Sequence, residues 1–326
     1  MEKSNEEIIS AVNSFSQQKI IVLGDIILDQ YFQCKVDRIS PEAPVPVAVL
    51  QSVKNVLGGA ANTAHNISSL DAECYLVGLT GEDNEGKILN TLLGRNIVTG
   101  ILTKKDYQTI VKTRVVDGNH QLVRIDREVI MAIDKTTENI LLQTIKKHIE
   151  KVKYIVVSDY AKGLFTKTFC RKIILLASEN KIKICVDPKP GNYMNFIGSY
   201  LVKTNRKEAE IFLNKKIDHD YKNLILLMKT LKKRLKSTVV VITLGKDGIA
   251  LLDENDTYRH FHNHKKEVFD VSGAGDTVIA SLTLGLSSGL STNEAVRLSN
   301  ICAGIVVGKF GTAVPTIKEI IYELRV

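Results

Sequence analysis

The sequence predicts an α/β protein with a doubly wound, largely parallel sheet, helices on both faces, and a small β lid. From about residue 139 onward, short apolar runs typical of buried strands alternate with stretches of helical period. Most of these runs end in glycine or polar residues, which would lie together at one edge of the sheet. Two further regions, about 31–56 and 107–128, alternate in polarity and predict lid strands.

The composition is that of an ordinary globular protein, with 326 residues of which 44% are hydrophobic and 25% charged. This length can support one sizeable core, so we expect a single domain over 1–326. No apolar run approaches the roughly 18 residues of a membrane span, and the polar N-terminus shows no signal sequence. Five cysteines without a C-x-x-C pair predict buried thiols. We therefore expect a cytoplasmic protein with no membrane partner.

The formal net charge of +8 is compatible with nucleic acid or with small anionic substrates. Much of the excess lies on helix-like segments such as 229–236, where a solvated face is the usual reason for charge. The chain has no tryptophan and no basic stripe interleaved with aromatic residues, which single-strand binding would need. We therefore expect no nucleic-acid partner.

The N-terminal part predicts a short helix over 5–18 and a buried strand over 19–23. Asp29 follows that strand at the sheet edge where open α/β proteins bind ligands, so it is a candidate for holding sugar hydroxyls. A turn or cap role is the alternative. Gly58 and Gly59, followed by small residues and Asn62, predict close backbone approach at the start of a helix.

The two lid regions predict exposed strands. The first holds two strands around a proline-rich turn, and proline favours sheet edges. The second predicts a hairpin of 109–116 and 121–125. The two pieces could pair into a small sheet that covers a site. Exposed edges also invite pairing between subunits, so we expect a homodimer formed through the lid.

The remaining α/β units follow one another regularly. The predicted strands are 74–77, 154–157, 183–186, 200–203 and 238–242, and the predicted helices are 138–150, 166–179 and 221–236. The pair Asn205-x-x-Glu208 opens another helix. Its spacing is that of a capping box, but a carboxylate there could also hold hydrated Mg²⁺ near phosphates.

The most informative stretch is 269–277, FDVSGAGDT, which follows a strand-like segment over 266–268 and precedes an apolar helix-like run. Gly273, Ala274 and Gly275 predict a tight turn whose free amides open a helix and attract an anion. Asp276 can be interpreted as a helix cap. Alternatively it is a base that accepts a proton from a hydroxyl while the amides hold a transferring phosphoryl group.

Taken in order, four motifs resemble those of the ribokinase-like (PfkB) carbohydrate kinases, and the likeness spans about 19–315. They are Gly58-Gly59-Ala60-Ala61-Asn62, Asn205-x-x-Glu208, Thr243-x-Gly245-x-x-Gly248 and Asp270 through Asp276. Segments 38–47, 158–163, 187–189 and 306–312 further resemble the kinases that phosphorylate D-glycero-β-D-manno-heptose 7-phosphate at O1. That resemblance implies a step in the synthesis of ADP-heptose, a precursor of the lipopolysaccharide core. Because the sequence ends at Val326, it also implies a separate adenylyltransferase for the following step.

The resemblance implies a role for each matching residue. Asp276 would be the base, and the amides of Gly273, Ala274 and Gly275 the anion hole. ATP and Mg²⁺ would be the cofactors, with Glu208 holding Mg²⁺ through water. The nucleotide side would comprise Asn205, Glu208, Thr243, Gly245, Gly248 and Asn300. The sugar side would comprise Asp29, Gly58, Gly59, Asn62 and Asp159.

Two further groups carry more than one interpretation. Asp270 and Ser272 match a site where many family members hold a monovalent cation such as K⁺. Val271 stands where many of them have threonine, which leaves the need for K⁺ open. Basic residues of the lid and strand ends could bind a substrate phosphate or could simply lie on the surface; they are Arg38, Arg114, Arg124, Lys162 and Lys189. The alternatives to a heptose kinase are another PfkB-type kinase of ribose, fructose or fructose phosphate, and a non-catalytic nucleotide- or sugar-binding regulator.

Overall fold

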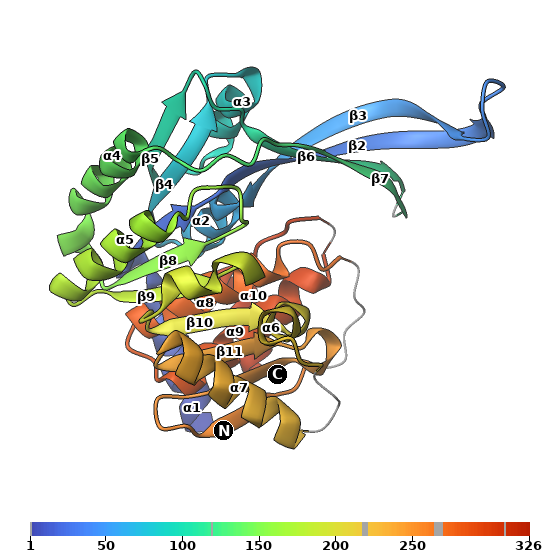
Figure 1. Cartoon of the computed structure of the whole chain (residues 1–326). Helices are drawn as coiled ribbons and strands as arrows, with labels where there is room; N and C mark the ends of the chain where they lie inside the picture. Colours follow the sequence, from blue (N-terminus) through green and yellow to red (C-terminus); the bar gives the residue numbers. More distant parts are fainter. Residues whose placement is uncertain (1, 119, 217–220, 264–269, 310) are drawn as a thin grey trace.

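The computed structural model describes residues 2–118, 120–216, 221–263, 270–309 and 311–326. The chain forms an α/β body from which a ribbon of strands projects to one side (Figure 1). In the part described, the strands form a nine-stranded sheet in the order β13-β12-β11-β10-β9-β8-β1-β4-β5. A second sheet has the order β3-β2-β6-β7. The strand expected over 266–268 lies outside the described residues.

The large sheet is parallel from β5 to β11, which confirms the predicted doubly wound architecture. Strands β12 and β13 add an antiparallel edge that the sequence did not predict. The strands are β1 (Lys19–Gly24), β4 (Glu73–Gly81), β5 (Ile97–Lys104), β8 (Tyr154–Ser158), β9 (Lys183–Asp187), β10 (Leu201–Asn205), β11 (Val239–Thr243), β12 (Ile249–Leu252) and β13 (Tyr258–Phe261).

Helices cover both faces of this sheet, as predicted. The alternation along β1 shows why: Ile20 and Val22 enter one hydrophobic core, while Ile21 and Leu23 enter the other. The helices are α1 (Glu2–Asn13), α2 (Ala60–Ser69), α3 (Asn84–Leu92), α4 (Lys135–Lys146), α5 (Lys167–Glu179), α6 (Arg206–Leu213), α7 (Tyr221–Leu235), α8 (Ala274–Ser287), α9 (Thr292–Val307) and α10 (Ile317–Arg325).

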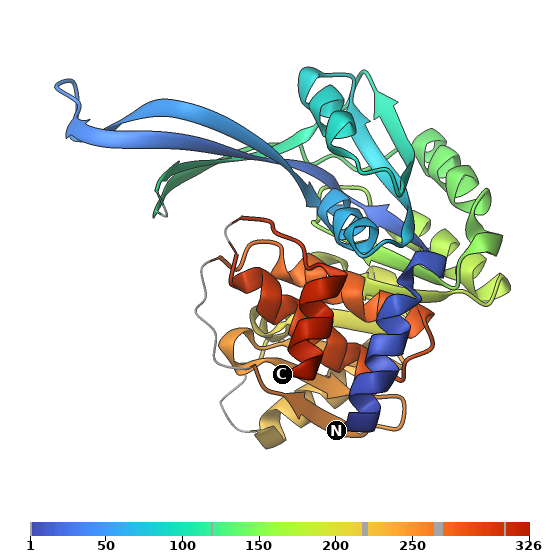
Figure 2. The same ribbon diagram turned by 180° about the vertical axis from the view of Figure 1, so that it is seen from behind.

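The ends of the chain meet on the face seen in Figure 2, where α1 lies beside α10. The side-chain amide of Asn5 donates to the carbonyl of Leu324 at 2.8 Å. The predicted helix over 5–18 is α1 followed by a short 3₁₀ turn, Phe15–Gln17. Helix α8 runs through the core and is buried from Asp276 to Ser287 because it is apolar around almost its whole circumference. Within the described ranges, no helix combines the length and apolar character that crossing a membrane requires.

The second sheet is the predicted lid. Strand β2 (Ile26–Ile39) pairs antiparallel with β3 (Pro46–Gly59) and parallel with β6 (Ile110–Asp117), and β6 pairs antiparallel with β7 (His120–Arg127). The two regions expected to pair therefore do so. Strand β2 starts earlier than the predicted lid region, because its root is buried in the body and only its outer part is exposed. The pairing of β2 with β3 contains a bulge between Gln33 and Cys34.

Candidate active site

The predicted turn before α8 is present. Gly273 adopts a φ of +78°, a conformation that favours glycine, and a Cβ there would lie 2.8 Å from Nδ2 of Asn62. The amide of Ala274 donates to the carbonyl of Val271 at 3.3 Å, so it is already used within the turn. The amide of Gly275 belongs to the first turn of the helix, where amides have no partner within the helix. This turn therefore presents backbone donors and the positive end of a helix dipole.

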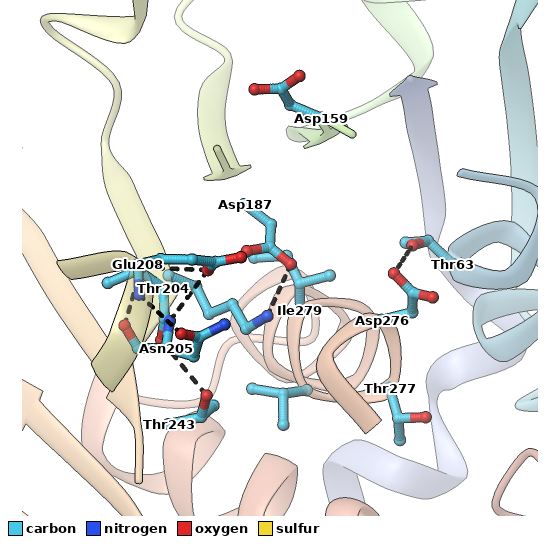
Figure 3. A network of polar contacts seen from close by, with 12 residues as sticks. Thr63, Asp159, Asp187, Thr204, Asn205, Glu208, Thr243, Asp276, Thr277 and Ile279 are labelled. Carbon is cyan, nitrogen blue, oxygen red and sulfur yellow. Dashed lines mark hydrogen bonds and ion pairs between the residues drawn. The ribbon is translucent and has the colours of Figure 1, made fainter. Parts of the chain in front are cut away.

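Asp276 lies buried at this turn, and its carboxylate contacts side chains from other elements. Oδ2 accepts a hydrogen bond from Nδ2 of Asn62 at 2.7 Å. Oδ1 accepts from the hydroxyl of Tyr160 at 2.7 Å. It also accepts from the hydroxyl of Thr63 at 3.3 Å, as Figure 3 shows. The N-cap position belongs to Gly273, so the structure does not support the cap interpretation. Burial raises the pKa of Asp276 to about 6, although the bonds from Asn62 and Tyr160 lower it.

Asp29, the candidate for contacting sugar, lies on β2 and faces the lid. Its Oδ1 accepts from Arg114 on β6 at 2.7 Å, and both side chains are largely buried. A Cβ on Gly58 would lie only 2.7 Å from Oδ2 of Asp29, so glycine there lets the backbone pass close to the carboxylate. Gly59 has a φ of +58° and precedes α2, which carries Asn62. The predicted sugar-side residues of β2, β3 and α2 are thus brought together.

Asp25, which follows β1, and Asp159, which follows β8, hold loops of the site by hydrogen bonds. Asp159 accepts from the amides of Ala161 and Lys189 and from Nδ2 of Asn192, at 2.7 to 3.1 Å. Both of its oxygens are thus engaged in holding the loop after β9. Asp25 accepts from the amide of Tyr160 at 2.8 Å, and its own amide donates to the carbonyl of Ser158 at 3.2 Å. Burial, with the neighbouring Asp159, raises the pKa of Asp25 to about 7.

The capping box predicted at Asn205 is present at the start of α6. Oδ1 of Asn205 accepts from the amide of Glu208 at 2.9 Å, and Oε2 of Glu208 accepts from the amide of Asn205 at 3.3 Å. The other oxygen of Glu208 is paired with Lys189. Figure 3 shows Glu208 near Asp187, which lies at the end of β9. The cap fixes Glu208 in place and leaves it within the site, so the two interpretations of this motif are compatible.

The residues predicted for the nucleotide side include Thr243 at the end of β11, Gly245 and Gly248 in the turn that follows, and Asn300 in the middle of α9. The hydroxyl of Thr243 donates to the carbonyl of Thr204 at 3.4 Å. Gly245 and Gly248 both have positive φ, and a Cβ on Gly248 would overlap the carbonyl oxygen of Phe261 at 1.9 Å. Nδ2 of Asn300 donates to the carbonyl of His262 at 3.1 Å. Its buried Oδ1 has no hydrogen-bond partner among the described residues, so it is an available acceptor.

A family model described as pfkB family carbohydrate kinase matches residues 17–319. The chain belongs to this family. It is 40% identical over 305 residues to the bifunctional protein HldE of Helicobacter pylori (strain P12), covering 93% of this chain and 66% of that protein. It is 39% identical over 306 residues to the HldE protein of Aliarcobacter butzleri, with 93% and 63% covered. The chain thus spans about two thirds of the length of these relatives.

Solved structures share the fold. A ribokinase of Arabidopsis thaliana in complex with ribose and ATP has a TM-score of 0.77 at 17% identity, covering 95% of this chain and 99% of that one. Phosphofructokinase-2 of Escherichia coli has a TM-score of 0.78 at 18% identity, covering 94% and 98%. The chain is an ATP-dependent carbohydrate kinase with a ribokinase-like fold.

The stretch proposed for a monovalent cation in this PfkB kinase is fastened to the loop after α9. Oδ1 of Asp270 accepts from the amide of Ser272 at 2.8 Å, and Oδ2 accepts from that of Gly311 at 3.2 Å. Val271 is exposed. In the part of the chain that the structure describes, no three His, Cys, Asp or Glu side chains are grouped closely enough to hold a metal by themselves. Asp270 therefore orders the turn that precedes α8.

The predicted basic residues differ in their positions in this PfkB kinase. Lys162 is paired with Glu128 at 2.6 Å, and Arg124 is paired with Asp126 on the lid. Arg38 is exposed and lies nine residues beyond Asp29 on β2, about 30 Å away at the rise of an extended strand. The structure therefore brings the other basic candidates towards the site but places Arg38 far from the Asp276 of its own subunit.

Sequence reasoning missed several residues of the PfkB site. Tyr160 and Thr63 contact Asp276, yet each is separated from it by more than a hundred residues. Lys203 and Asp187 form a buried ion pair of 2.6 Å, and a Cβ on Gly275 would lie 2.9 Å from Nζ of Lys203. A lysine within an apolar strand was the available signal for this pair. The ammonium of Lys203 therefore lies beside the turn at Gly273 to Gly275.

Proposed function

We propose that this kinase transfers the γ-phosphoryl group of ATP to O1 of D-glycero-β-D-manno-heptose 7-phosphate, giving the 1,7-bisphosphate used to make ADP-heptose. The observation that carries the proposal is the position of Asp276, buried beside the turn at Gly273 to Gly275 and adjoining the sugar-side residues. Support for the sugar comes from segments 38–47 and 158–163, which resemble heptose 7-phosphate kinases, and from 40% identity to HldE. The proposal covers the kinase reaction alone.

In the proposed reaction, the O1 oxygen bonds to the γ-phosphorus, and the bond from that phosphorus to the bridging oxygen of ADP breaks. Asp276 accepts the proton that O1 loses. Its raised pKa of about 6 leaves it mostly ionised at neutral pH and still basic enough to accept a proton in the transition state. The amide of Gly275 and the ammonium of Lys203, which lies beside Gly275, would stabilise negative charge on the transferred group.

The carboxylates near the phosphates fit a divalent ion, which we propose is Mg²⁺. Oδ1 of Asp187 is buried without a hydrogen-bond partner among the described residues. Burial, together with the charge of nearby Glu208, raises the pKa of Asp187, although Lys203 and Lys189 lower it. Oxygen ligands of this kind suit Mg²⁺ that keeps part of its water shell. When bound, the ion would neutralise charge on the ATP phosphates. Asp187 and Glu208 would hold it, directly or through water.

The function is tested by ADP release with heptose 7-phosphate, compared with ribose, fructose, fructose phosphates and adenosine. We expect kcat/KM to be highest for heptose 7-phosphate, because the site combines a base for a sugar hydroxyl with several basic side chains. A clear preference for an unphosphorylated sugar would overturn the substrate and leave the family assignment unaffected. Omitting Mg²⁺ should abolish turnover, and omitting K⁺ tests the cation site at Asp270.

We also propose that two copies dimerise through their lids. Apolar side chains on the outer lid are unusually exposed for a soluble protein: Val49, Leu50 and Val53 are 46 to 50% exposed, and Ile125 is 55% exposed. Pairing would cover these side chains and the open strand edges. Sedimentation velocity should show a dimer at micromolar concentration, and Leu50→Asp should shift it towards monomer. A wild-type protein that sediments only as a monomer would contradict the proposal.

A further inference from the structure

The lid face that looks onto the site carries charged residues in two adjacent cross-strand rows. In the first row, Lys112 of β6 lies between Asp29 of β2 and Asp126 of β7. In the next row, Arg114 is the neighbour of Arg124. Side chains two residues apart on a strand point to the same face, so both rows face the same way. One lysine thus lies between two aspartates, with two arginines beside them.

Both aspartates form ion pairs with the arginines and not with Lys112. Asp29 binds Arg114 at 2.7 Å, and Asp126 binds Arg124 through two hydrogen bonds of 2.8 and 3.0 Å. Across the described ranges of the chain, Lys112 has neither a hydrogen-bond acceptor nor a carboxylate within ion-pairing distance. Other basic side chains near the site are already paired with carboxylates; these are Lys162, Lys189 and Lys203.

Lys112 nevertheless lies close to the catalytic group. Its Nζ is 5.8 Å from the centre of the Tyr160 ring, and the hydroxyl of that tyrosine donates to Asp276. One tyrosine therefore separates the free ammonium from the proposed base. Lys189 lies 5.3 Å from the same ring, but it is bound to Glu208. The side chain of Lys112 is thus directed towards the site, with the ring of Tyr160 between its ammonium and Asp276.

The surroundings of Lys112 favour an incoming anion. Burial lowers the pKa of Lys112, and the positive charges of Lys162 and Arg124 lower it further, more than Asp126 and Glu128 offset. A charged group that is partly desolvated and repelled by neighbours of like charge is stabilised when an anion binds beside it. A phosphate in this position would relieve the repulsion among the three basic side chains and give Lys112 the acceptor that it lacks.

We propose that Lys112 binds the phosphate that the sugar already carries and so determines the preference for phosphorylated substrates. The inference rests on the proposed function, because it concerns the end of the sugar opposite the hydroxyl that Asp276 deprotonates. Arg114 and Arg124 then act indirectly: by binding Asp29 and Asp126, they keep those carboxylates away from Lys112. Specificity then comes from an ammonium that no carboxylate of the described residues pairs with.

The test compares heptose 7-phosphate with unphosphorylated heptose in the wild type and in Lys112→Met. The variant should lower kcat/KM for the phosphorylated sugar about 10- to 100-fold, the usual effect of losing a hydrogen bond to a charged group. It should leave kcat/KM for free heptose and KM for ATP nearly unchanged. Lys112→Arg, which keeps the charge, should retain most of the preference. Lys35→Met is the matched control, because Lys35 lies on the same lid with its side chain 66% exposed and paired with Asp37.

The outcomes separate this inference from the function on which it rests. If the wild type prefers heptose 7-phosphate and Lys112→Met keeps that preference, the function stands and the role of Lys112 is wrong. An equal loss on both sugars would show that Lys112 only supports the fold, which also overturns the inference. A wild type that prefers free sugar would overturn both. Should the methionine variant fail to fold, as judged by thermal unfolding, Lys112→Gln gives the same comparison with a polar side chain.

Discussion

Replacing Asp276 by asparagine should lower kcat by about a thousandfold, within the range that general bases contribute, while ATP affinity changes little. Asparagine is nearly the same size, and its oxygen can still accept from Asn62 while its NH2 group donates to the hydroxyl of Tyr160 or Thr63. It cannot, however, accept the proton from the sugar. Steady-state kinetics measures kcat, and calorimetry of ATP binding tests whether the nucleotide side is intact. Asp106→Asn, on an aspartate that is 70% exposed, is the control and should behave like the wild type.

A second measurement links this effect to ionisation. In the wild type, kcat/KM should fall as the pH drops below about 6, because the base is then protonated and cannot accept a proton from the substrate. The residual activity of Asp276→Asn should lack that acid limb. If Asp276→Asn retained a near-normal rate, or if its kcat/KM still fell below about pH 6, Asp276 would not be the base. The reaction would then need another proton acceptor.

Replacing Lys203 by methionine should lower the free energy of unfolding by about 3 to 5 kcal/mol, the usual effect of removing one partner of a buried ion pair. Lys203 and Asp187 are both buried and 2.6 Å apart, so the substitution leaves a carboxylate without its counter-charge. Urea unfolding followed by circular dichroism measures the change. Lys19→Met, which breaks a partly exposed pair with Glu73, should change stability by less than about 1 kcal/mol.

The double variant Lys203→Met with Asp187→Leu shows whether the unpaired charge is the cause. Replacing both members of a buried pair by apolar residues often restores stability. We therefore expect the double variant to recover most of the loss while remaining inactive, because both residues lie at the phosphate side. If Lys203→Met alone is as stable as the wild type, water or a neighbouring cation such as Lys189 compensates Asp187, and the pair contributes little to folding.

The features that sequence predicted best have local causes. The turn before α8 is encoded by Gly273 and Gly275, whose need for close approach can be inferred from the residue type alone. The capping box at Asn205 is likewise a pattern of four residues. The parallel sheet follows from repeated strand and helix periods, and the lid follows from two regions of alternating polarity.

The features that sequence did not predict depend on which distant side chains meet. Tyr160 was visible beside Asp159, but only the packing of β8 against α8 brings its hydroxyl to Asp276. In the sequence, Arg38 and Arg114 looked equivalent as basic residues of the lid. In the structure, Arg114 binds Asp29, whereas the length of β2 places Arg38 far from Asp29. Strands β12 and β13 were overlooked because each has only four residues, too few for a distinct period.

The junction between β1 and β2 has a mechanical consequence. A single residue, Asp25, joins the core strand to the lid strand, and its backbone is bonded to Ser158 and Ala60 while its carboxylate holds the amide of Tyr160. The root of the lid is thus fixed to the body next to Tyr160, whose hydroxyl contacts the proposed base Asp276. We expect bending to be easiest beyond the bulge at Gln33 and Cys34, because the pairing is irregular there and the strands are exposed. We therefore expect the root of the lid, which carries Asp29, to stay rigid while its free end bends.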